Sequence, residues 1–248
     1  LDLHVERLNQ QHRDDDYLEL TMDASIGERD VSLTAEAGTW NALLEQKDVE
    51  YELNAQLDTL VIESKGRIDD LLAPRKPVLS FSAKGPDVND LARLLQVPER
   101  GAGDIDLSGS LAAPDDGNLV LSVDGNLGQI QVEGAGYFSD LQDLEQFDID
   151  VSVSGPDVGQ LLGLAGIEQL PGVAFELDID AERQGAMVIV RKASVSIAEA
   201  NLDLSAQLPE FPSLANSRLH FEIVGERFER FREILNLPGG ATGPYSLA

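Results

Sequence analysis

The chain has 248 residues, of which 45 are acidic and 18 basic, so its formal net charge at pH 7 is −27. This charge excludes nucleic acid as a partner, because phosphates would repel the chain, and it disfavours docking of this segment on an anionic membrane surface. Cysteine is absent, which excludes disulfides, thiol nucleophiles and thiolate metal sites. No run of 18 or more apolar residues occurs, so we expect membrane contact only through segments outside these residues.

The sequence pattern of the first 84 residues predicts strands almost throughout. Apolar residues fall on alternate positions, the pattern of a strand with one buried face. We expect strands at residues 1–5, 17–26, 30–37, 49–57, 60–64 and 78–83. Residues 1–84 are therefore predicted to form an all-strand N-terminal unit.

A module with a period of 70 residues follows. Gly-Pro-Asp-Val at residues 85–88 returns at residues 155–158, and Gly-Glu-Arg-Phe at residues 225–228 opens a third, truncated copy. A fixed period of this kind marks an array of stacked units. We predict two full repeats, residues 85–154 and 155–224, and a partial one, residues 225–248.

Each repeat opens with a short amphipathic helix. Pro and Asp suit the first helical turn, and Val88, Leu91, Leu94 and Leu95 form one apolar stripe that ends before Pro98. Equivalent helices are expected at residues 156–167 and 226–237. Packing of the stripe on a sheet is the favoured interpretation, and capping or gating of a groove is the alternative.

Four strands are expected after each helix. They are residues 104–111, 118–124, 127–138 and 147–154 in the first repeat, and residues 173–181, 187–191, 194–208 and 218–224 in the second. Asp116-Gly117 and Asp124-Gly125-Asn126 are hairpin signals. Short hairpins between successive strands indicate an antiparallel meander.

Clean alternation makes one side of this sheet aliphatic and the other acidic. About fourteen strands exceed the roughly ten that an open twisted sheet usually holds. The apolar face can therefore be the core of a sandwich or barrel, or the lining of a trough that meets an external apolar molecule. Periodicity leaves these two alternatives open.

The Gly-Pro-Asp helix followed by strands such as Gly-Ala-Gly-Asp-Ile-Asp-Leu-Ser-Gly, residues 101–109, resembles the repeating part of the AsmA family. These bacterial envelope proteins are related to TamB and are counted among the bridge-like lipid transfer proteins. The resemblance implies a mostly β fold, in which a long antiparallel meander curls into an elongated apolar, β-taco-like groove with one short helix per repeat. It also implies an inner-membrane-anchored periplasmic protein of a Gram-negative bacterium that carries phospholipid acyl chains between the two membranes.

Inward-facing apolar positions are the only site residues that this resemblance suggests, and ordinary core packing is the alternative for each. The expected lining residues are Leu119, Leu121, Val123, Ile130, Val132, Phe147, Ile149, Val151, Val153, Phe175, Leu177, Ile179, Leu219, Phe221 and Ile223.

Catalytic and metal-binding patterns are not found in the sequence. No histidine has a partner at metal-ligand spacing, and no phosphate-binding loop or nucleophile elbow is present. Paired aspartates follow the strand period on the solvent side, so solvation explains them better than a glycosidase pair or a calcium site. The histidines are His4, His12 and His220, and the pairs are Asp104/Asp106, Asp148/Asp150 and Asp178/Asp180. We expect a non-enzymatic protein without metal or cofactor.

Other functions compete with lipid transport. An envelope assembly factor or scaffold could pair client strands along an open sheet edge and assist outer-membrane protein biogenesis, with other envelope proteins as partners. A cell-surface adhesion module would need exposed aromatic platforms, for which one Trp and four Tyr are few. A hydrolase is the weakest alternative.

Overall fold

The computed structural model describes residues 3–12, 17–26, 29–70, 77–90, 103–113, 118–139, 146–159, 172–197, 199–210, 216–229 and 242–247. The predicted Asp116-Gly117 turn and most of the three predicted helices lie outside these residues.

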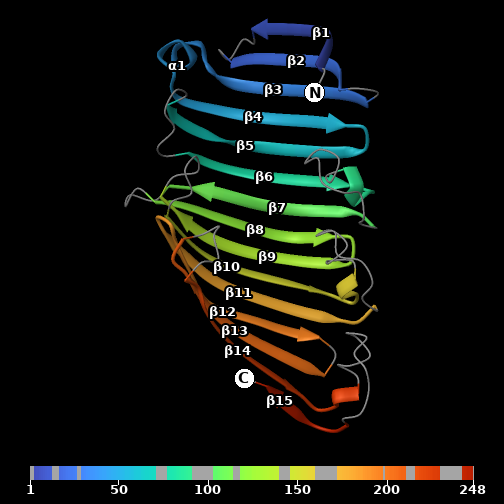
Figure 1. The fold of residues 1–248 in the computed structure, drawn as a ribbon. Coiled ribbons are helices and arrows are strands. Elements are labelled where there is room, and N and C mark those ends of the chain that lie inside the picture. The colour runs from blue at the N-terminus through green and yellow to red at the C-terminus, as the bar shows by residue number, and fades with distance from the viewer. Residues whose placement is uncertain are drawn as a thin grey trace.

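One long antiparallel sheet forms the molecule (Figure 1), with fifteen strands in sequence order and the termini at its opposite ends. The strands are β1 (Leu3–His12), β2 (Tyr17–Ile26), β3 (Arg29–Thr39), β4 (Lys47–Leu57), β5 (Leu60–Asp70), β6 (Val78–Gly85), β7 (Ile105–Ala112), β8 (Leu119–Leu127), β9 (Ile130–Phe138), β10 (Gln146–Gly155), β11 (Phe175–Gln184), β12 (Met187–Ile197), β13 (Ala200–Leu208), β14 (Arg218–Gly225) and β15 (Tyr245–Leu247). The sheet is open and slightly curved. This confirms the mostly β, antiparallel meander.

The predicted hairpin at residues 124–126 is wrong. Gly125 lies inside β8, paired with Leu107 of β7, and the chain turns instead at residues 128–129, between the paired residues Leu127 and Ile130. Leu127 therefore ends β8 and does not begin the next strand. The Asp-Gly-Asn sequence misleads because Gly125 uses its positive φ of 146° within the strand.

The predicted boundaries within residues 187–208 are also wrong. β12 continues through residues 192–193, and the chain turns between Ile197 and Ala200. The register shifts between Val190 and Ala193, which is the signature of a β-bulge. The bulge interrupts the apolar–polar alternation, so the sequence suggests a turn where the strand continues.

A short helix that the sequence analysis did not predict, α1 (Trp40–Glu45), joins β3 to β4 (Figure 1). The Thr39 hydroxyl accepts a hydrogen bond of 3.3 Å from the Ala42 amide and caps its first turn. Gln46 ends it in the left-handed conformation, with φ 58°. Six residues are too few for helical periodicity to stand out between strands.

Helical backbone begins at Val88, Val158 and Phe228, the latter two each two residues after the predicted helix starts at residues 156 and 226. The carboxylates of Asp87 and Asp157 accept hydrogen bonds of 2.9 and 2.8 Å from the amides two residues on, as N-caps do. The remaining positions of the apolar stripes, such as Leu91, lie outside the described residues.

The first helical residue of each repeat packs on one long margin of the sheet. Val88 is buried with Leu60 and Ile105. Seventy residues later, Val158 is buried with Ile130 and Phe175. In the third copy, the Phe228 and Tyr245 rings meet edge to face with centroids 5.2 Å apart. Equivalent residues thus make equivalent contacts, although the division into units stays an interpretation.

Candidate functional site

Strand register places every predicted lining residue on the same face of the sheet, which we call the apolar face. A row of directly paired residues crosses this face from β2 to β14, and we call it the central row. Its members are Leu20, Ala35, Leu53, Ser64, Phe81, Gly109, Val123, Gly134, Val151, Ile179, Ala193, Leu204 and Phe221. Ser64 is its one hydroxyl residue, and its oxygen is hydrogen-bonded to the Tyr51 hydroxyl at 3.0 Å.

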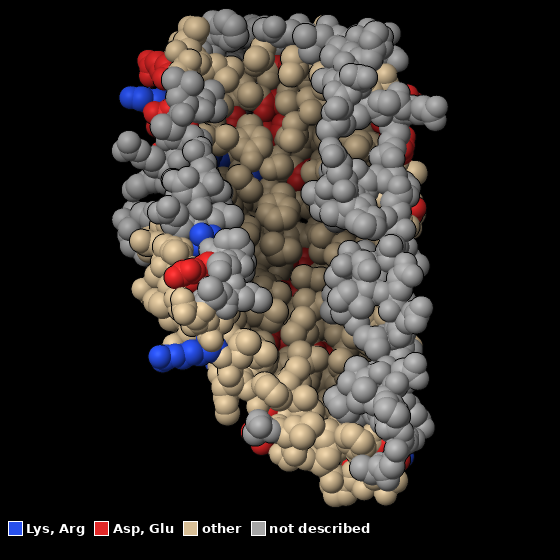
Figure 2. All heavy atoms as spheres, viewed as in Figure 1, with Lys and Arg blue, Asp and Glu red and all other residues tan. Residues whose placement is uncertain are grey.

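Burial differs between the ends and the middle of the strands. Near the strand ends, Leu119, Ile130 and Phe175 are buried, with exposed fractions of 8%, 3% and 3%. The central row is half-buried throughout, except for Phe221, which is 44% exposed. Figure 2 shows this face recessed along its middle, where uncharged residues predominate. Apolar side chains in the middle of the sheet therefore remain within reach of solvent.

No second sheet covers this face within the described residues, because all fifteen strands belong to one sheet. The accessible surface of the chain is 15272 Å², whereas a compact monomer of 26.8 kDa would expose roughly 10,800 Å². The large surface is that of a single extended layer. The sandwich interpretation of the apolar face therefore has no partner layer among the described elements.

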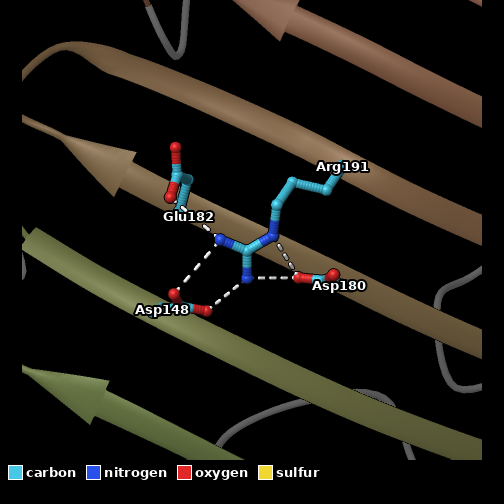
Figure 3. A network of polar contacts seen from close by, with 4 residues as sticks. All are labelled: Asp148, Asp180, Glu182 and Arg191. Carbon is cyan, nitrogen blue, oxygen red and sulfur yellow. Dashed lines mark hydrogen bonds and ion pairs between the residues drawn. The ribbon is translucent and has the colours of Figure 1, made fainter.

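The opposite, polar face holds many acidic residues, several of them in a network around Arg191 (Figure 3). Arg191 donates to Asp148 on β10 at 2.5 and 3.1 Å, to Asp180 on β11 at 2.7 Å, and to Glu182 at 2.9 Å. The hydrogen bonds that Arg191 donates to Asp148 and then to Asp180 raise the pKa of Arg191 above its ordinary value. The network joins three neighbouring strands across the solvent side of the sheet.

Other acids of the predicted pairs also have partners on the polar face. Asp178 accepts a hydrogen bond of 2.5 Å from Ser152, and Asp106 lies 3.1 Å from the Lys84 ammonium. His220 is exposed on β14 opposite Ser205. Within the described ranges, no group of three or more histidine and acidic side chains is arranged to hold a metal ion.

In the described part of the chain, no helix has the length and apolarity needed to cross a membrane.

Among the residues of the apolar face that the predicted lining left out is a charged one, Arg183. The predicted strand ended at residue 181, but β11 continues to Gln184, and register places Arg183 between Phe147 of β10 and Val188 of β12. Extending the alternation by two residues would have found it, since Ile179, Ala181 and Arg183 share one face.

Comparison of the chain with protein-family models, with curated proteins and with solved structures found no match.

Proposed function

We propose that this protein binds phospholipid acyl chains along its apolar face and conducts them without catalysis. The observation that carries the proposal is the central row, a line of mostly apolar residues, half-buried except for Phe221, that crosses thirteen strands without a covering layer among the described residues. An uninterrupted apolar surface of this size usually meets another apolar partner. In this proposal, the recess of Figure 2 is a groove and its lining is the predicted set of residues.

Burial supplies the binding energy. Each acyl methylene removed from water gains about 0.8 kcal/mol, and the head group stays in solvent at the margin of the sheet. Because most members of the row are small or aliphatic, with Phe81 and Phe221 as its aromatic members, an acyl chain that shifts by one strand exchanges one set of apolar contacts for a similar set. Sliding along the groove would therefore meet only small barriers.

A place in the cell envelope follows from the resemblance of the Gly-Pro-Asp repeats to the AsmA family. In this setting the groove would carry phospholipid between the inner and outer membranes of a Gram-negative bacterium. The anchor in the inner membrane would lie in segments outside these residues.

Mass spectrometry of organic extracts tests the proposal on protein purified from bacteria without detergent. We expect phospholipid with the wild-type protein and its loss from Val151→Asp, which places a charge in the central row. Gln131→Asp is the matched control, because Gln131 is exposed on the polar face of β9 beside Ser154. A lipid-free wild type, or equal loss in both folded variants, would contradict acyl-chain binding.

A second candidate function uses the edge of the sheet. Among the described residues, β15 pairs only with Ile223–Gly225 of β14, and Leu219 and Phe221 are 62% and 44% exposed. An envelope assembly factor could bind a client strand at such an edge by strand addition. Cross-linking from an introduced Leu219→Cys to added outer-membrane protein strands, with Gln131→Cys as control, would favour this function if only the edge position reacted.

A further inference from the structure

Arg183 is the one charged residue whose register position lies on the apolar face among the described strand residues from β6 to β15. It is half-buried close to the end of β11, at the margin of the sheet opposite the helical starts. Placing a charge on an otherwise apolar face costs hydration free energy, so the presence of Arg183 there requires a physical reason.

Within the described residues, the Arg183 guanidinium makes a single hydrogen bond, from Nε to the Gly185 carbonyl oxygen at 2.8 Å. The remaining N–H donors of its planar fork are left for a ligand. Arg191, on the other face, is in contrast surrounded by Asp148, Asp180 and Glu182. Among the described residues, Arg183 has no carboxylate partner.

Aromatic side chains lie beside this charge. Phe147 is directly paired with Arg183, and the Phe147 and Phe138 rings have centroids 6.4 Å apart. Val188, paired with Arg183 on the other side, is buried with 8% exposure. A cation is thus placed at the end of a line of apolar groups, the arrangement that matches a molecule with an anionic head and an acyl tail.

We propose that Arg183 binds the phosphate of a lipid head group while the acyl chain lies over Phe147 and continues along the apolar face. This inference rests on the proposed function, because it assigns the head-group position to the same groove. The ligand class is an anionic, phosphate-bearing amphiphile. The guanidinium fork suits phosphate oxygens through two parallel N–H···O bonds.

Calorimetric titration with two probes tests the assignment. The first probe is a lauroyl glycerol phosphate and the second is lauroyl glycerol, both below their micelle concentrations. We expect the wild type to bind the phosphate-bearing probe on the order of tenfold more tightly. Arg183→Met should abolish this advantage and keep the affinity for lauroyl glycerol within about twofold, because the methionine retains apolar contact.

Lys192→Met is the matched control, because it removes one positive charge from the polar face of the adjacent β12, opposite Asp180. It should keep the phosphate preference, and Arg183→Lys should keep part of it. The assignment is overturned if both methionine variants lose the preference equally, if the wild type shows none, or if inorganic phosphate alone binds as tightly. Binding of lauroyl glycerol without a phosphate preference would overturn only the head-group site, whereas binding of neither probe would overturn the groove as well.

Discussion

The amide of Val158 donates a hydrogen bond of 2.8 Å to the carbonyl oxygen of Val173, and this bond fixes the start of the second repeat helix against the strand that follows it. The same bond joins Val88 to Gly103 at 2.8 Å and Phe228 to Gly243 at 2.9 Å. All three pairs are separated by fifteen residues and recur every seventy. This backbone hydrogen bond therefore recurs with the period of the sequence.

Val158→Ala should lower the free energy of unfolding by about 1–3 kcal/mol, because it empties space between Ile130 and Phe175 in a buried cluster. Urea denaturation followed by circular dichroism measures the change. Val224→Ala removes the same two methyl groups from a side chain that is 44% exposed on β14, and it should change stability by less than about 0.5 kcal/mol. Equal effects would mean that Val158 does not anchor the repeat.

Gly125→Ala should be strongly destabilising, by more than about 2 kcal/mol. A Cβ at Gly125 would lie 2.0 Å from the Asp106 carbonyl oxygen, and the positive φ of 146° disfavours any side chain. Gly134→Ala is the comparison, because a Cβ there meets its nearest neighbour, Val151, at an ordinary 3.6 Å. Thermal unfolding should separate the two variants, and similar melting temperatures would show that β8 tolerates a side chain at residue 125.

Tyr245 should ionise at a higher pH than a free tyrosine on alkaline titration. Burial raises the pKa of its phenol above the ordinary value. A raised folded-state pKa favours the neutral form, so the stabilisation is complete below the unfolded pKa and is lost as the pH rises through the folded one. Absorbance at 295 nm should show a late component that Tyr245→Phe removes. A wild-type curve unchanged by this substitution would contradict the buried environment.

Arg191→Met should weaken the sheet locally at low ionic strength, because Asp148, Asp180 and Glu182 would then lose the guanidinium that they share. Salt screens exposed charges, so the difference from wild type should shrink between about 0.05 and 1 M NaCl. Melting temperatures across this range measure it. Lys192→Met is the charge-matched control, and an identical salt response in both variants would show that net charge, and not the network, is responsible.

The apolar–polar alternation and the seventy-residue period predicted most of the fold. Because a strand places successive side chains on opposite faces, the alternating sequence of residues 147–154 predicted both a strand and which of its residues lie on the apolar and polar faces. The period of seventy predicted that Val88 and Val158 would occupy equivalent places, which their clusters show. Turns were less predictable. The Asp-Gly-Asn sequence around Gly125 lies within β8, because a glycine with positive φ serves inside a strand as well as in a hairpin.

Only the tertiary structure determines the features that depend on which residues are paired on neighbouring strands. The bulge near Arg191 interrupts the apolar–polar alternation of β12. Three carboxylates from β10 and β11 surround the Arg191 guanidinium, and this contact requires the observed register of β10, β11 and β12. Whether Arg183 belongs to the sheet at all depends on where β11 ends. Above all, hydrophobic alternation identifies the apolar face of a strand but does not show which element covers that face. The central row is half-buried because all fifteen strands lie in one sheet, an arrangement that the alternation does not predict.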